Sequence, residues 1–217
     1  AGDGSLTLEG DIPEQNVFGV NYLLRTRLTL RRGASCIEIQ DKLCNLGSAP
    51  GEYEMLYHTN FGPPFLEEGA HYVGTHDQAV PRDEIARAGL PEMSRFAAPT
   101  PGFTEQVFLF RAAADASGWA HQVLSNAAES LAVHVSFAVD TLPYTILWKR
   151  TSAMEDGYVM GMNPCSDLPN TRSVERKEGR LATVPAHGEV VFRHTIEPVE
   201  GVEAVKALMA SLGGHRR

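Results

Sequence analysis

The chain has 217 residues, of which 43% are hydrophobic, enough to build one large domain with a substantial core. It carries 19 Lys and Arg against 27 Asp and Glu, a formal net charge of -8, which argues against nucleic acid and anionic membranes as partners because both are negatively charged. No apolar run approaches the ~20 residues needed to span a bilayer, and no signal-peptide pattern opens the sequence. We therefore expect a soluble, cytoplasmic protein.

The beginning of the sequence predicts a strand followed by a hairpin. AGDGSLTLEG has no methionine and becomes strand-like almost at once, as expected of a processed product, one half of a larger domain or a trimmed chain. Residues 21–30 (NYLLRTRLTL) and 35–43 (SCIEIQDKL) then flank RRGA. This pattern predicts two antiparallel strands joined by a glycine-containing loop.

The cysteines are three in number: Cys36, Cys44 and Cys165. An odd count without a Cys-x-x-Cys pair indicates reduced thiols of a cytosolic protein and argues against a disulfide framework or a zinc site. Cys165 lies in a loop-like segment, so a nucleophilic role is conceivable, although the sequence shows no neighbouring base.

The segment YEMLYHTNF, residues 53–61, predicts a strand that stops at Gly-Pro-Pro. Alternation would place Glu54, Leu56, His58 and Asn60 on one face, and Tyr53, Met55, Tyr57 and Thr59 on the other. His58 and Asn60 would then stand together at a strand end, where a sheet can supply residues to a cleft. The alternative is a half-buried histidine satisfied by a neighbouring group.

Residues 64–105 are long, proline-bearing and weakly periodic, which is typical of a functional loop or lid. His71 and His76 lie five residues apart with Asp77 adjacent, so a metal site is conceivable there. Five residues match neither one helical face nor one strand face, so we expect these side chains on a solvated loop and no metal in the protein.

Further strands are predicted over most of the remaining chain, separated by Gly, Pro, Asn or Asp clusters. In residues 130–139 (SLAVHVSFAV) the alternation is clean, with a core face of large apolar side chains and a second face that is small and polar. Only residues 202–213 (VEAVKALMASLG) predict a helix. His121, His187 and His194 are expected to be surface or hydrogen-bonded residues. The pattern predicts an antiparallel sandwich or barrel.

The stretch from Trp148 to residue 181 is the second candidate for chemistry. Trp148 precedes two cations, Lys149 and Arg150, and a later strand ends at Asn163 before a loop rich in Asp, Asn and Arg. An indole can stack on a pyranose ring while such polar groups bind its hydroxyls. The alternative places Trp148 in the core and Arg172 on the surface. The composition fits a sugar or polyol better than a phosphorylated ligand.

Four blocks of the sequence together resemble a known family: LYHTNFG, EQVF, LPYTILWK and NPCSDLPNTR. YHTNFG resembles the N-H-[ST]-Y-F-N signature of aldose 1-epimerases, with His58 on the signature histidine. GMNPCSDLPN resembles the later segment of those proteins, a strand that runs into a Glu-containing turn. The chain is thus similar, over residues 20 to 197, to the galactose mutarotase-like superfamily and most similar to an uncharacterised branch of it.

The resemblance implies an all-β, galactose mutarotase-like antiparallel β-sandwich (supersandwich) with a carbohydrate cleft on a large sheet and a short C-terminal helix. It implies that residues 1–217 form a single domain that is incomplete at its N-terminus. The family's earlier histidine segment has no counterpart here, and the chain starts about 100 residues later than the family, so an N-terminal segment is expected to complete the domain.

The resemblance also implies an acid/base reaction without metal or cofactor. His58 would protonate the ring oxygen, and a glutamate would take the proton of the anomeric hydroxyl. The position of that glutamate is Asn163, whose amide does not titrate, so Asp167 or Glu105 are alternatives. The expected substrate-binding residues are Asn60, Phe61, Glu105, Trp148, Lys149, Asp167 and Arg172.

Three functions remain open from the sequence. The first is a sugar isomerase that interconverts the anomers of an aldose, with a small-molecule carbohydrate as its partner. The second is a carbohydrate-binding protein that lacks a base, as Asn163 favours. The third is a lyase or epimerase acting on an oxidised or acidic sugar, with Lys149 or Arg150 facing a carboxylate.

Overall fold

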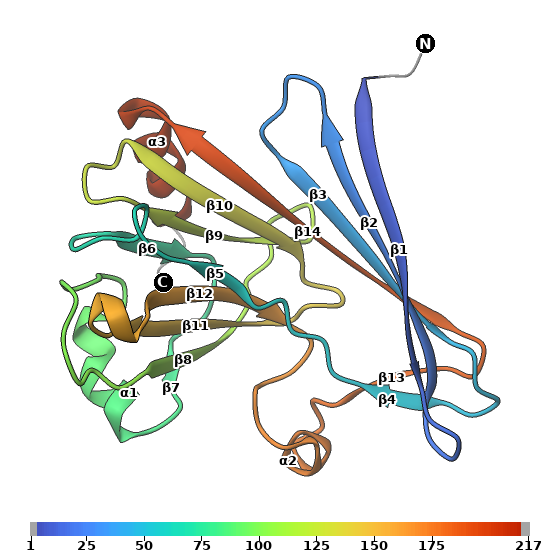
Figure 1. Ribbon diagram of the computed structural model, residues 1–217. Coiled ribbons are helices and arrows are strands. Elements are labelled where there is room, and N and C mark those ends of the chain that lie inside the picture. Colours follow the sequence, from blue (N-terminus) through green and yellow to red (C-terminus); the bar gives the residue numbers. More distant parts are fainter. Residues whose placement is uncertain (1–3, 214–217) are drawn as a thin grey trace.

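The computed structural model describes residues 4–213, which form two large antiparallel sheets packed face to face (Figure 1). The seven-stranded sheet has the order β1-β2-β3-β14-β10-β9-β6, and the five-stranded sheet has the order β5-β12-β11-β8-β7. A two-stranded ribbon, β13-β4, lies beside them. The predicted all-β antiparallel sandwich is confirmed.

Most strands follow the predicted runs, but the strand expected over residues 53–61 is divided between β4 of the ribbon and β5 of the five-stranded sheet. Their bounds are β1 Ser5–Gln15, β2 Asn21–Arg31, β3 Ile37–Asn45, β4 Gly51–Tyr53, β5 Thr59–Phe61, β6 His71–Gly74, β7 Val80–Pro81, β8 Gln106–Arg111, β9 Trp119–Ser125, β10 Leu131–Ala138, β11 Tyr144–Thr151, β12 Tyr158–Cys165, β13 Ala182–Val184 and β14 Glu189–Glu200. The predicted hairpin is the pair β2–β3, in which Leu24 faces Leu43.

Residues 4–213 contain three α-helices, α1 Glu84–Gly89, α2 Arg172–Lys177 and α3 Val202–Gly213, together with the 3-10 turns η1 Leu90–Glu92 and η2 Met154–Asp156. The predicted C-terminal helix α3 covers the outer face of the seven-stranded sheet through Val205, Met209 and Leu212, which pack with Val123 of β9. Among residues 4–213, no helix is long and apolar enough to cross a membrane.

The main core fills the space between the two large sheets. Phe108 of β8, Leu147 of β11 and Met160 of β12 meet Leu124 of β9 and Val135 of β10. All five are fully buried, and each contributes about 1.5–3 kcal/mol relative to exposure to water. The core therefore fixes which face of the five-stranded sheet points inward and which points outward.

Residues 64–105, predicted to be a functional loop or lid, are not an irregular loop. This segment contains β6, β7, α1 and η1, and it buries Leu66, Tyr72 and Phe96 in the main core. Its apolar side chains are spaced irregularly, so the sequence shows no period, but tertiary burial holds the segment in place. The α1 helix is capped at its N-terminus by Asp83, whose side chain accepts a hydrogen bond from the backbone N–H of Ala86.

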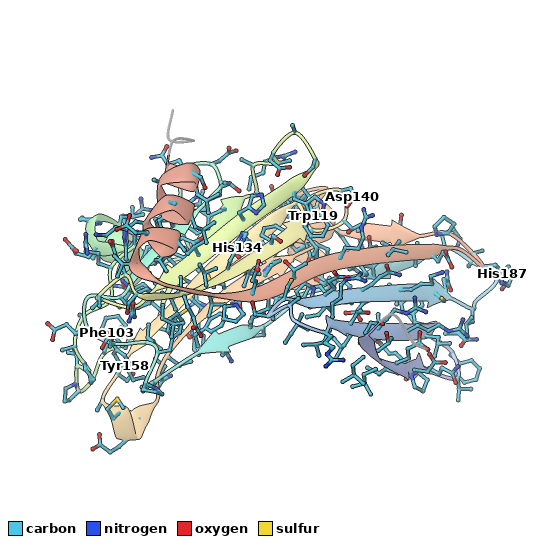
Figure 2. All side chains as sticks on the ribbon, turned by 90° about the horizontal axis from the view of Figure 1, so that it is seen from above. Phe103, Trp119, His134, Asp140, Tyr158 and His187 are labelled. Atoms are coloured by element: carbon cyan, nitrogen blue, oxygen red, sulfur yellow. The ribbon has the colours of Figure 1, made fainter. Side chains whose placement is uncertain are left out.

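The strands β1 to β3 extend away from the body as a wing, with His187 at its far end (Figure 2). One face of the wing carries ion pairs, including Arg27 with Glu9. The other face is apolar, and its outermost strand leaves Leu6, Leu8 and Ile12 more than half exposed. All eleven residues of β1 are exposed.

Candidate functional site

The outer face of the five-stranded sheet carries the candidate site, and the strand register places its residues in rows. Trp148 of β11 lies opposite Gly161 of β12 and Val107 of β8, and Gly161 lies opposite Asn60 of β5. Side chains directly opposite each other point to the same face of a sheet. The first row therefore contains Asn60, Gly161, Trp148 and Val107.

A second row contains His58. Asn60 pairs with Gly161 and Leu56 forms a bridge with Cys165, so His58 between them lies opposite Asn163. Ile146 of β11 continues this row on the other side of Asn163. The predicted alternation of residues 53–60 agrees with this placement, because Tyr57 on the opposite face contacts the second core cluster.

A third row lies on the other side of Trp148. Arg150 pairs with Val159, and the pairing of Lys149 with Gln106 places Glu105 opposite Arg150. Neighbouring rows on one face are about 7 Å apart along a strand. The row of His58 and the row of Glu105 thus flank the Trp148 indole from opposite sides.

Direct contacts join the three rows. The His58 and Trp148 ring centroids are 5.4 Å apart in an edge-on arrangement. Trp148 Nε1 donates a hydrogen bond to Glu105 Oε2 at 2.8 Å, and Arg82, next to β7, donates to Glu105 Oε1 at 2.7 Å. The result is a continuous chain of side chains from the imidazole across the indole to an ion pair.

His58 is oriented by its neighbour. Its Nδ1 lies 2.8 Å from Asn60 Oδ1, which only accepts hydrogen bonds, so Nδ1 carries a proton and donates it to Asn60. The other ring nitrogen, Nε2, remains for a ligand. Asn60 thereby fixes the tautomer and orientation of the imidazole, as a positioning residue does for a proton-transferring histidine.

Glu105 is held in its charged form. The hydrogen bond from Arg82, and after it the bond from Trp148, lower the pKa of this carboxyl below its usual value. Glu105 therefore stays ionised well into the acidic range. This placement gives the site one fixed negative charge beside two arginines, Arg82 and Arg150.

Asn163 lies buried at the floor of the site. Its side chain is 2% exposed, and its Oδ1 has no hydrogen-bond partner among the described residues. The amide lies over Gly161, since a Cβ added to that glycine would come within 2.8 Å of both amide atoms. Asn163 therefore carries a shielded amide oxygen without a partner, and it has no titrating group.

Two of the expected substrate-binding residues point away from this face. Phe61 packs against the main core and contacts Phe65, with ring centroids 6.3 Å apart. Lys149 is buried on the inner face, where Nζ donates to the carbonyls of Glu92 at 2.8 Å and Arg95 at 2.6 Å. Burial lowers the pKa of Lys149 to about 8. Both residues lie on the side opposite Trp148.

Two other expected substrate-binding residues, Arg172 and Asp167, lie on the same face as His58 but far from it. Arg172 forms an ion pair with Glu54 at 2.7 Å, and Asp167 sits beside the same glutamate. Glu54 precedes His58 by four residues, a separation of about 13 Å in extended chain. Burial and the charge of Glu54 raise the pKa of Asp167 to about 6. The structure does not bring Asp167 to the imidazole.

Cys165 and His194, two further candidates from the sequence, are both buried. Cys165 is fully buried, and burial raises the pKa of its thiol. His194 is buried against Tyr57, and burial lowers its pKa to about 4. Within residues 4–213, no three His, Cys, Asp or Glu side chains are grouped as a metal would require.

The structure adds Arg82 and Gly161 to the residues found from the sequence. Arg82 follows a strand of only two residues, and no pattern in the sequence connects it with Glu105. Gly161 is recognisable only once the register places it between Asn60 and Trp148.

Comparison with known proteins identifies a family and a fold. The family model described as Domain of unknown function (DUF4432) matches residues 1–197. No curated protein matches the chain. Several solved structures share its fold, and the first of them is 26% identical to it.

That structure is a candidate aldose 1-epimerase from Klebsiella pneumoniae, with a TM-score of 0.94 over 98% of this chain and 56% of its own. A galactose mutarotase-like protein from Clostridium acetobutylicum is 16% identical, with a TM-score of 0.61 over 90% of this chain and 62% of its own. A candidate aldose 1-epimerase from Escherichia coli is 13% identical, with a TM-score of 0.60 over 92% of this chain and 67% of its own. The chain thus spans less than two thirds of the first two proteins.

Proposed function

The chain belongs to the DUF4432 family and has the galactose mutarotase-like fold, and on this premise we propose that it binds a carbohydrate on the outer face of its five-stranded sheet and interconverts the anomers of an aldose. The observation that carries the proposal is the joining of His58, Trp148 and Glu105 by direct contacts. The imidazole of His58 can act as the acid and the carboxylate of Glu105 as the base. The indole of Trp148 between them can carry the sugar ring.

The sugar ring lies on the indole of Trp148. This side chain is only partly buried, and Gly161 opposite it carries no side chain, so that the amide of Asn163 lies over the glycine. Apolar C–H groups of a pyranose stack on an aromatic face, while its hydroxyls need hydrogen-bond partners. The amides of Asn60 and Asn163 supply such partners on the His58 side.

Proton transfer between two side chains and the sugar would carry the reaction. Protonated His58 gives the Nε2 proton to the ring oxygen as Glu105 takes the proton of the anomeric hydroxyl, and the bond between C1 and the ring oxygen breaks. Rotation about C1–C2 turns the aldehyde over. The reverse transfers close the ring and restore both side chains, so the exchange consumes no other reactant.

The low pKa of Glu105 has a consequence for the pH dependence. A carboxyl whose pKa is lowered stays in its basic form until the pH falls below its usual range. The acidic limb of the rate profile is therefore expected at a lower pH than an unperturbed glutamate would give. Loss of rate already between pH 6 and 5 would point to Asp167 as the base.

Exchange NMR on the purified chain with a panel of free aldoses tests the proposal. We expect exchange between α and β anomers faster than in buffer for at least one sugar, and a loss of about 10²- to 10³-fold in Glu105→Gln. An exchange rate equal to the buffer blank for every sugar would overturn the isomerase function.

Asn163 supports a second candidate function, carbohydrate binding without catalysis. The residue faces His58 and cannot accept a proton as a base does. Under this alternative, sugars give saturation-transfer signals without anomer exchange in the wild type, and Asn163→Glu introduces exchange. If Glu105 is the base, Asn163→Glu does not raise the rate.

A further inference from the structure

Arg150 is the arginine of the candidate site that forms no ion pair with a residue of 4–213, although its charge helps to lower the pKa of the Glu105 carboxyl. Arg82 forms ion pairs with Glu105 at 2.7 Å and Asp83 at 3.3 Å. Arg150, in contrast, forms no ion pair or hydrogen bond with any residue of 4–213 through its side chain. Its Nε is shielded from solvent and has no hydrogen-bond acceptor.

A shielded guanidinium nitrogen without an acceptor is unfavourable, because it loses water and gains no partner. Glu105, directly opposite, does not fill this role. One of its oxygens accepts from Arg82 and the other from Trp148, so the carboxylate is turned toward those two donors. The guanidinium group of Arg150 is therefore available as a hydrogen-bond donor to a ligand that lies on the neighbouring row, the row of Trp148.

The geometry of strand β11 places Arg150 next to Trp148 on the outer face of the sheet. Arg150 follows Trp148 by two residues on β11, so both side chains point to the outer face with their Cα atoms about 7 Å apart. An arginine side chain extends about as far as this separation. A group attached to a sugar ring on Trp148 is therefore within its reach, on the side opposite His58.

We propose that the ligand of this site is a sugar with an anionic substituent, which Arg150 binds on the Glu105 side of the Trp148 platform. The inference rests on the proposed carbohydrate site. A planar guanidinium matches a carboxylate in a two-point hydrogen-bonded pair, so a sugar acid is the expected chemical class. A sugar phosphate presents the same charge and is a separate arm of the test.

Binding measurements on matched pairs of sugars test the inference. The probes are D-glucuronate with D-glucose, D-galacturonate with D-galactose, and D-glucose 6-phosphate, titrated calorimetrically at low salt. The wild type is expected to bind the acid of a pair about 10- to 100-fold more tightly than the neutral sugar. Arg150→Gln should abolish this preference and leave the affinity for the neutral sugar unchanged.

Two further variants separate recognition from bulk charge and from folding. Arg111→Gln removes an exposed arginine on the same sheet face, six residues of strand away by register, and should keep the preference. Arg150→Lys keeps the charge without the planar fork and should retain an intermediate preference. Urea unfolding shows whether each variant is folded.

The outcomes distinguish the inference from the proposed function. The inference is overturned if the wild type binds neither the sugar acids nor glucose 6-phosphate more tightly than the neutral sugars, if a preference survives in Arg150→Gln, or if no probe binds. An Arg150-dependent preference for glucose 6-phosphate alone supports an anionic substituent and identifies it as phosphate. Arg150-dependent binding of a sugar acid without anomer exchange supports the inference and removes the isomerase function.

Discussion

Lys149 and Arg150 are neighbours in β11 on opposite faces of the five-stranded sheet, and their hydrogen bonding differs. On the inner face, Lys149 is buried and its ammonium donates to two backbone carbonyls. On the outer face, the neighbouring residues of the same strand are Trp148 and Arg150, and Arg150 Nε has no acceptor among the described residues. Asn163 Oδ1 on this face also has none.

This difference separates structural polar groups from those available to a ligand. A buried polar group that is satisfied within the chain stabilises a particular arrangement of the backbone. A shielded group that is left unsatisfied costs free energy, and a ligand that completes its hydrogen bonds recovers that cost. Changes on the inner face should therefore affect stability, and changes on the outer face should affect binding and turnover.

The largest effect is expected for His58→Ala. Loss of the proton donor should reduce anomer exchange by about 10²- to 10⁴-fold, measured by exchange NMR, with little change in the urea midpoint. The matched change is Tyr57→Phe on the opposite face, which removes the hydrogen bond to Asp41 at 2.6 Å. It should lower stability and leave exchange intact. Unchanged exchange in His58→Ala would remove this residue from the mechanism.

A smaller effect, on stability alone, is expected for Lys149→Met. The carbonyls of Glu92 and Arg95 would lose their donor, at a cost of about 3 kcal/mol in the free energy of unfolding. Arg150→Met, one residue further along β11, should change this free energy by less than about 1 kcal/mol. Urea titrations measure both variants. Equal destabilisation by the two changes would contradict the contrast between the faces.

Asp167→Asn is expected to stabilise the protein at neutral pH. The pKa of Asp167 is raised from 3.8 to about 6, so the folded state binds the proton more tightly than the unfolded state. Wild-type stability therefore falls as the pH rises from 3.8 to 6, and the asparagine variant avoids this loss. We expect a gain of about 2 kcal/mol at pH 8 and none below pH 3.8. A gain that does not depend on pH would contradict this account.

The smallest effect is expected for Gly161→Ala. The new methyl group would contact the flexible amide of Asn163 rather than backbone, so the loss of stability should stay below about 1 kcal/mol. Displacement of the amide should weaken sugar binding about tenfold. Calorimetric titration with the best sugar of the panel measures this change, and Gly10→Ala in exposed β1, where an added Cβ meets nothing within 4 Å, is a control for the loss of a glycine.

Much of the fold could be predicted because its elements follow simple periods. Alternation located most strands, and the spacing of Val205 and Met209 located α3. Helices α1 and α2 have only six residues each, too short to show a helical period. The structure of residues 64–105 could not be predicted because their burial depends on contacts with distant strands. One example is the hydrogen bond from Gln122 to the hydroxyl of Tyr72.

For the candidate site, the sequence supplied individual residues but not their arrangement. His58, Asn60 and Trp148 could be identified from strand ends and residue type. The opposite orientation of Lys149 follows from its place next to Trp148 in one strand, because successive side chains point to opposite faces. The contact of Glu105 with Arg82 could not be predicted, since it depends on how β7 and β8 pair.

The outermost strand of the wing has a consequence for how the chain behaves at high concentration. Within residues 4–213, β1 is the outermost strand of the seven-stranded sheet, and Leu6, Leu8 and Ile12 form an apolar row along it. An edge of this kind is a template onto which another extended polypeptide can add. The seven-stranded sheet is therefore open to an eighth strand, and a single lysine in place of Leu8 should keep the chain monodisperse where the wild type self-associates.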